Sequence, residues 1–240
     1  MKLFVQTIQI AKKDLQIAVS SPLMYVFCFV GTLLVGVFFY LSLLVSPEAN
    51  LRMLTVNMAL SNIVLMPMLG MRMFAEEEKQ GTLEMLIGLP GSLWALVLGK
   101  FLMGLVVSSS ILLTACLYTG VLSWLGTPDW GAIATALLGQ GLCMSVCLSI
   151  SMCASTVTKE PMAAGLVGAL GILPMWISDS LMHTIDNKVV GMLVQDISLM
   201  QHLVPLSKGI LDVGDVFWFV AVTGIFLWTT ERFLELKRCQ

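Results

Sequence analysis

Long hydrophobic stretches recur along the chain and are separated by short polar segments. A helix needs roughly 20 mostly apolar residues to cross a bilayer, and six stretches approach or exceed this length. They are residues 24–45, 54–71, 94–122, 132–154, 162–177 and 216–233. None of them alternates strictly between apolar and polar positions, as a membrane-spanning strand does. The pattern therefore predicts an all-α polytopic membrane protein with six transmembrane helices.

The segment before the first span has a different, amphipathic pattern. Its polar helical face holds Gln9, Lys12, Lys13 and Gln16, and its apolar face holds Phe4, Ile8, Ala11, Leu15 and Ala18. This spacing predicts a helix over residues 1–22 that lies in the membrane interface. The alternative is a charged flank that only sets the topology of the first span.

Residues 178–215 form the longest connection between spans. Pro174 and Asp179 blur the end of the fifth span just before it. The middle of the connection, VVGMLVQDISLMQHLVPL, is too polar to cross a bilayer. We expect it to form short helices on the outer surface or a re-entrant piece buried against protein. Asp212 and Asp215 precede the last span and are expected to cap its helix, because acids favour a helix N-terminus.

The composition supports membrane insertion. Hydrophobic residues make up 58% of the chain and charged residues 12%, with a mean hydropathy of +0.92. Soluble domains carry about a quarter charged residues. With both termini in the cytoplasm, ten of the 13 lysines and arginines fall on the cytoplasmic side, and only Arg52, Lys188 and Lys208 fall outside. This bias follows the positive-inside rule.

A short charged linker, FAEEEKQGTLEMLIGLP, joins the second and third spans on the cytoplasmic side. Gly81 interrupts it, Thr82 is placed to cap a helix, and Glu84 lies in that helix's favourable first turn. The helix is expected to end before Pro90. An apolar stripe on it comprises Leu83, Leu86 and Ile87.

A helix this short is marginal in water unless it docks on something. Its stripe can pack against the ends of its own spans, or it can fit a groove on a partner. Lys100, about two turns into the third span, can pair with Glu76, Glu77 or Glu84 and brace the linker. The alternative for Lys100 is snorkelling to the interface.

Some polar residues lie inside the spans. Asn57, Ser61 and Asn62 are expected to pack between helices, with lining of a pathway as the alternative. Cys143 and Cys147 lie one turn apart and favour ordinary packing over a site for a thiophilic metal.

The linker and its flanks, MRMFAEEEKQGTLEMLIGLPGSLWALVLGKFL, resemble the signature of ABC-2 type transporter permeases. The matching residues are Glu76, Glu77, Lys79, Gly81, Thr82, Leu83, Glu84, Pro90, Gly99, Lys100 and Phe101. Gln80 departs from this pattern, where a serine or a basic residue is more usual. A second stretch, HLVPLSKGILDVGDVFWF at 202–219, is similar to the subfamily of gliding-motility and nitrous-oxide-reductase-maturation permeases.

The resemblance implies a role for the linker. In this family the short helix between the second and third spans is a coupling helix that fits a cleft of a separate ATPase subunit. It implies two permease chains and two ATPase chains in an inner (plasma) membrane, usually for export. The residues carried over for coupling are Glu76, Glu77, Gly81, Thr82, Glu84, Leu86, Pro90 and Lys100.

The chain contains no G-x-x-x-x-G-K-[ST] phosphate loop. The resemblance thus implies no cofactor, metal or catalytic residue in this chain, with ATP and Mg²⁺ bound by the partner. An intramembrane enzyme is disfavoured because the spans hold almost no ionisable residues and no histidine. The remaining alternative is a membrane scaffold of the same fold that recruits partners without moving a substrate.

Overall fold

The computed structural model describes residues 2–45, 51–88, 92–125, 129–182 and 196–238. Within these residues the regular structure is entirely helical. Six of the described helices are long and apolar enough to cross a membrane. They are α2 (Pro22–Val45), α3 (Leu51–Gly70), α6 (Leu93–Leu125), α7 (Trp130–Val157), α8 (Pro161–Met182) and α11 (Val213–Arg238). The predicted all-α fold with six candidate membrane-spanning helices is confirmed.

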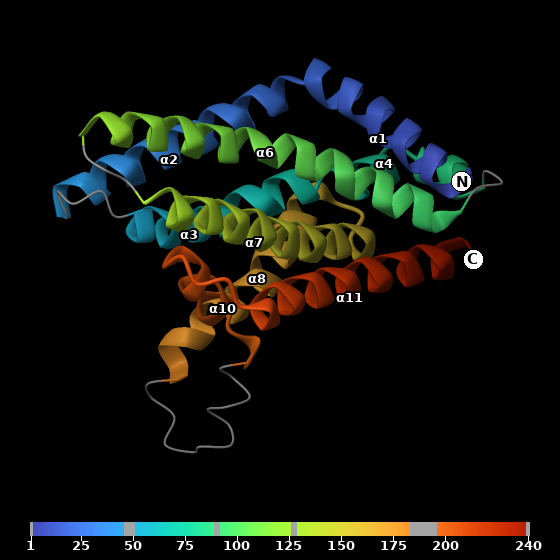
Figure 1. Cartoon of the computed structure of the whole chain (residues 1–240). Coiled ribbons are helices and arrows are strands. Elements are labelled where there is room, and N and C mark those ends of the chain that lie inside the picture. The colour runs from blue at the N-terminus through green and yellow to red at the C-terminus, as the bar shows by residue number, and fades with distance from the viewer. Residues whose placement is uncertain (1, 46–50, 89–91, 126–128, 183–195, 239–240) are drawn as a thin grey trace.

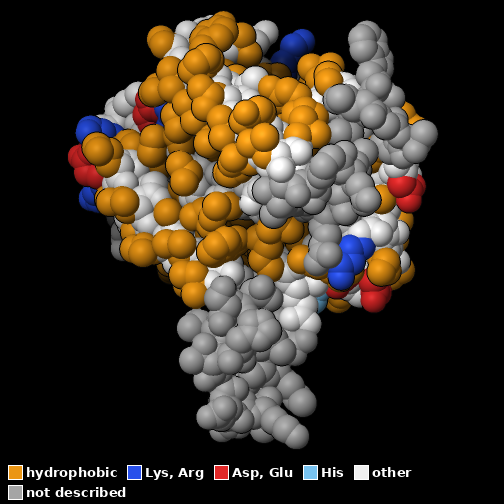
Figure 2. All heavy atoms as spheres, turned by 90° about the vertical axis from the view of Figure 1, so that its left-hand side faces the viewer, with side chains coloured by type: hydrophobic (Ala, Val, Ile, Leu, Met, Phe, Trp, Pro, Cys, Tyr) orange, Lys and Arg blue, Asp and Glu red, His pale blue; other side chains and the backbone are white. Residues whose placement is uncertain are grey.

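Helix α7 is the centre of the bundle. It contacts α3, α6, α8, α10 and α11, and 67% of its most hydrophobic window is buried, against 22% for α11. The N- and C-termini lie at the same end of the bundle, which we call the N/C end (Figure 1). Figure 2 looks at the opposite end and shows mostly hydrophobic side chains on the described residues. Exposed large hydrophobic side chains along the outer helices, such as Leu117 of α6, Leu170 of α8 and Val220 of α11, form apolar surface of the kind that faces lipid.

Small residues bring the central helices close together. Gly70 of α3 and Gly168 of α8 both lie against Ser151 of α7, and a Cβ at Gly168 would be 3.3 Å from the Ser151 Cα. In a bilayer, where lipid tails are as apolar as the side chains, such close packing is a main force that joins helices.

Helix α1 (Lys2–Ser20) packs along α6. A Cβ at Gly99 of α6 would lie 2.8 Å from Ile10 Cγ2, so the two helices touch at this glycine. The buried face of α1 includes Thr7, while Phe4 and Ile8 are exposed. Phe4 and Ile8 belong to the apolar face of the predicted interfacial helix, so α1 packs on α6 with another face, which includes Thr7. Whether α1 lies in the membrane interface stays a prediction.

The connection between the last two spans begins later than expected. Helix α8 continues through Pro174 and Asp179 to Met182 rather than ending near residue 177. Residues 183–195 lie outside the described part. Helix α10 (Leu199–Ser207) then packs against α3, α7 and α8, with Leu203 and Leu206 buried. Of the two alternatives for this connection, α10 fits the piece buried against protein.

Two aspartates organise the start of α11 in different ways. Asp212 Oδ1 accepts a hydrogen bond from the Gly214 amide at 2.9 Å, which confirms its predicted cap. Asp215 lies instead 2.7 Å from His202 Nδ1 of α10. The His202 ring stacks on Trp218 with 4.4 Å between centroids. The His202–Asp215 pair therefore joins α10 to α11, a contact that the sequence did not predict.

The polar residues inside the spans serve packing where the structure describes their bonds. The Asn62 amide of α3 donates to Cys143 Sγ of α7 at 3.4 Å. Asn62, Cys143 and Cys147 are all buried. A hydrogen bond between two helices is what the first interpretation of Asn62, packing between helices, predicts.

Candidate functional site: the elbow between α3 and α6

The chain turns sharply between α3 and α6, at the N/C end of the bundle (Figure 1). We call residues 71–88 the elbow. It contains two short helices, α4 (Ala75–Lys79) and α5 (Leu83–Gly88). The sequence predicted α5 but not α4. Three consecutive glutamates occupy the first turn of α4 and Lys79 its last, which is the charge order that a helix dipole favours.

Gly81 makes the turn between α4 and α5. Its φ is +71°, in the left-handed region that favours glycine. The next residue closes the turn on α4, because the Thr82 amide and hydroxyl both donate to the Glu77 carbonyl, at 3.0 and 3.2 Å. The hydroxyl therefore does not cap α5 as predicted; it is directed to the preceding helix.

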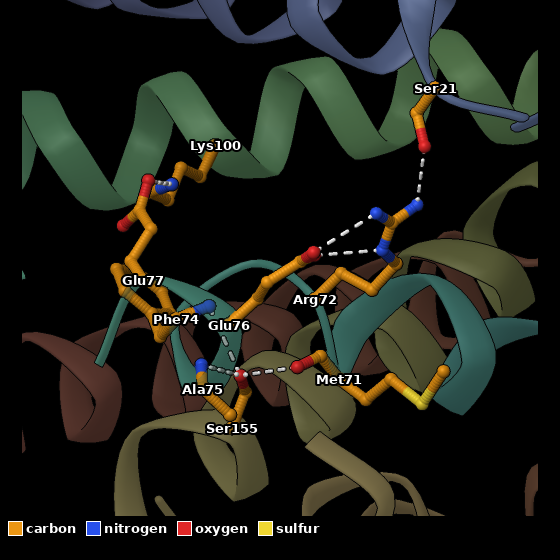
Figure 3. A network of polar contacts seen from close by, with 9 residues as sticks. All are labelled: Ser21, Met71, Arg72, Phe74, Ala75, Glu76, Glu77, Lys100 and Ser155. Carbon is orange, nitrogen blue, oxygen red and sulfur yellow. Dashed lines mark hydrogen bonds and ion pairs between the residues drawn. The ribbon is translucent and has the colours of Figure 1, made fainter. Parts of the chain in front are cut away.

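Ser155 of α7 holds the start of α4 from below (Figure 3). Its Oγ accepts hydrogen bonds from the amides of Phe74 and Ala75, at 3.1 and 2.9 Å. The same hydroxyl donates to the Met71 carbonyl at 3.3 Å. The first amides of a helix have no partner within it, so this buried side chain supplies one. Sequence reasoning missed Ser155, which is one of many serines in apolar helices.

Glu77 reaches Lys100 of α6 (Figure 3). Lys100 Nζ lies 2.6 Å from Glu77 Oε1 and 3.4 Å from Asp14 Oδ2 of α1. It also lies 5.3 Å from the centroid of the Phe74 ring, within range of a cation–π contact. The Lys100 side chain is only 4% exposed. It therefore pairs inside the protein rather than snorkelling, and Asp14 is a partner that the sequence did not suggest.

Glu76 faces a different cation. Its carboxylate accepts hydrogen bonds from Arg72 Nε and an Arg72 terminal nitrogen, at 2.8 and 3.2 Å. Such a bidentate pair is geometrically specific. The other terminal nitrogen of Arg72 donates to Ser21 Oγ at 3.0 Å, at the junction of α1 and α2 (Figure 3). The elbow is thereby joined to the first span.

The last two charges of α4 reach the C-terminal half of the chain. Glu78 pairs with Lys237, near the end of α11. Lys79 pairs with Glu160, immediately before α8, at 2.8 Å. Every charged residue of α4 thus has an ion-pair partner, and two of these partners, Lys237 and Glu160, lie far away in the sequence. The acidic run is a set of tethers rather than a solvated patch.

The outer face of α5 is left open. Leu83 and Ile87 are buried in the core of this chain, and Leu86 is half-buried. Glu84 is exposed, and Met85 is 77% exposed. The predicted stripe therefore packs largely on its own chain, which leaves Glu84 and Met85 facing outward. Pro90, also predicted for this site, lies outside the described residues.

Fold and site together define a multi-pass helical membrane protein whose spans meet at a tethered elbow. The family model described as ABC-2 family transporter protein matches residues 8–213. The chain therefore belongs to the ABC-2 transporter family, whose members are membrane components of ABC transporters and work with an ATP-binding partner. The match extends from α1 to the first residue of α11 and includes the whole elbow. A comparison with curated proteins gave no match.

Proposed function

We propose that this chain is the permease subunit of an ABC transporter and that its elbow is the coupling helix. The main support for this proposal is that one side of the elbow is bound to other helices of the chain while its other side is open. Its inner side is tied to Ser21 between α1 and α2, to α6, α7 and α11, and to Glu160 just before α8, by the hydrogen bonds and ion pairs above, while Glu84 and Met85 face outward. If a partner bound to its open side displaces the elbow, the bonds on its other side can transmit that displacement to several helices.

The ion pairs of the elbow differ in burial, and this difference determines how strongly a displacement of the elbow is transmitted to each helix. The Lys100–Glu77 pair is nearly enclosed, and its charges are poorly screened by water. The Lys79–Glu160 pair is more than half exposed on both sides, and exposed pairs contribute little. A displacement of α4 and α5 is therefore expected to move α6 with it more tightly than α8. Leu83 and Ile87 transmit the same motion through packed side chains.

The family supports a proposal for the assembly, and the charge distribution supports one for its orientation. We propose two permease chains with two ATP-binding subunits, which bind ATP and Mg²⁺, in the inner membrane. The elbow shares the N/C end with both termini (Figure 1), and the positive-inside rule assigns this end to the cytoplasm. Export is the expected direction. The narrower resemblance to gliding-motility and nitrous-oxide-reductase-maturation permeases is a proposal of the same kind.

Purification from native membranes tests this function without knowledge of the cargo. The tagged chain is expected to bring down a protein that hydrolyses ATP. Replacing Glu84 by Lys and Met85 by Asp should reduce the recovered ATPase activity at least tenfold, because both side chains are on the open face. Lys208→Glu, an exposed change beyond α10, is the matched control and should have no effect.

The thermal midpoint of each purified variant shows whether it is folded. The proposal is wrong if the unaltered chain recovers no ATPase. The coupling role of α5 is wrong if the folded double variant recovers as much ATPase as the control. ATP turnover that never responds to any candidate cargo would favour the scaffold alternative.

A further inference from the structure

A cleft opens between the α1–α2 junction and the elbow, and the proposed function assigns no ligand to it. Two cavities make up this cleft, with volumes of about 420 and 500 Å³. They adjoin, because the same five residues line both: Lys13, Asp14, Glu77, Leu86 and Lys100. Each cavity is in the size range of sites for organic ligands and is far larger than an ion needs.

The larger cavity is lined by several methionines. They are Met24, Met68, Met71, Met73 and Met103, from α2, α3, the elbow and α6, while the exposed Met85 lies at its outer edge. Phe27 adds an aromatic wall. Methionine side chains are unbranched and polarizable, so they adapt to flexible apolar ligands of varied shape. These methionines come from separate segments of the chain, and the fold brings them together around one space.

The acidic and basic side chains that line the cleft balance, with Asp14, Glu76 and Glu77 against Lys13, Arg72 and Lys100. Arg72 and Lys100 are held by the carboxylates of the elbow and α1. Lys13 lines both cavities, is exposed, and forms no ion pair with any described residue. The hydroxyl of Ser21 lies on the same rim. A ligand with a negatively charged headgroup can form an ion pair with Lys13.

The rim also lies beside the start of a candidate membrane span. Leu23, which lines the cleft, belongs to the first turn of the span α2 and is exposed, and Ile17 on α1 is exposed beside it. A polar rim above an apolar interior, at the start of a span, matches the boundary between lipid headgroups and acyl chains. The ligand can therefore enter from the adjacent leaflet.

We infer that this cleft binds an anionic phospholipid of the leaflet at the N/C end, with its headgroup at Lys13 and one acyl chain among the methionines. Occupancy would place the lipid beside Glu77 and Lys100, which face the same space. Lipid composition would then bias the position of the elbow. The binding itself is independent of the transport role and can be measured on the chain alone.

The test uses phosphatidylglycerol with a photoreactive diazirine near the end of one acyl chain, in phosphatidylcholine nanodiscs. After irradiation, peptide mass spectrometry should find label concentrated at Met68–Met73 and Met103, at least fivefold above the exposed α8 residue Leu170. Lys13→Glu should lower the cleft label at least threefold. Lys12→Glu is the matched control, since Lys12 is equally exposed but lines neither cavity.

Parallel reactions identify the source of the ligand. Diazirine phosphatidylcholine should label the cleft weakly and should not respond to the change at Lys13. Equal labelling of the cleft and Leu170, or equal loss in the Lys12 and Lys13 variants, would overturn the inference. So would cleft labelling by a free diazirine fatty acid with none by phosphatidylglycerol. The thermal midpoint of the Lys13 variant tests whether it is folded, and no change is expected because the substitution lies on an exposed helix face.

Discussion

Replacing Lys100 by Met removes the cation at the centre of the elbow. The change leaves Glu77 and Asp14 with buried carboxylates and no nearby countercharge, and it removes the contact with the Phe74 ring. Breaking a buried pair on one side costs about 3–5 kcal/mol. We take the lower value, about 3 kcal/mol, because the Glu77 side chain is 22% exposed and water can partly solvate it.

The assay is thermal unfolding of the purified chain in lipid nanodiscs, followed by tryptophan fluorescence. For a chain of this size each kcal/mol shifts the midpoint by roughly 2–4 °C, so Lys100→Met should lower it by about 6–12 °C. Lys79→Met is the matched control, because its pair with Glu160 is exposed. Such pairs contribute at most about 1 kcal/mol, so the midpoint should fall by no more than about 4 °C.

A double variant shows whether the loss comes from stranded charge. Adding Glu77→Gln to Lys100→Met removes one of the two uncompensated carboxylates, so the double variant should regain part of the lost stability. The reasoning is refuted if Lys100→Met and Lys79→Met shift the midpoint equally. It is also refuted if the double variant, with both Lys100→Met and Glu77→Gln, has a lower thermal midpoint than either single variant.

Three further changes probe the backbone and the helix contacts. Gly81→Ala should cost about 1–2 kcal/mol from the left-handed backbone alone, since a Cβ there meets nothing within 4 Å; an unchanged or raised thermal midpoint would contradict this. Gly99→Ala should loosen α1 by pushing on Ile10, seen as faster proteolysis of α1, whereas Gly224→Ala meets no neighbour and should leave α1 protected. His202→Ala should cost about 1–3 kcal/mol by leaving its carboxylate partner unpaired, and hydrogen exchange in α10 should rise; unchanged exchange would show that the packing of α10 alone suffices.

The spans and the existence of the elbow could be predicted from the sequence, because both depend on local patterns. Runs of apolar residues set the spans, and a glycine after an acidic run marked Gly81 as a turn. The same local reasoning found the pairing of Lys100, since Glu77 is only one linker away. Helix α4 was missed because five residues, three of them glutamates, leave no apolar periodicity to detect.

The partners of the elbow could not be predicted, because they depend on how distant helices pack. Lys237 and Ser155 lie on α11 and α7, and nothing near them in the sequence points to residues 74–78. The contact between α1 and α6 could not be predicted for the same reason. Its apolar pattern is compatible with lipid or protein, and only the contact at Gly99 of α6 decides which residues are buried.

The central claim is that an ATP-binding partner acts on the outer face of α5, and site-specific photo-cross-linking tests it most directly. Benzoylphenylalanine at Met85, and separately at the exposed Trp130 at the opposite end of the bundle, is irradiated in intact cells. We expect Met85 to capture a protein that azido-ATP also labels, with a yield that changes when vanadate traps the nucleotide, and Trp130 to capture no such protein. Capture of the ATP-binding protein from Trp130 but not from Met85 would contradict the account.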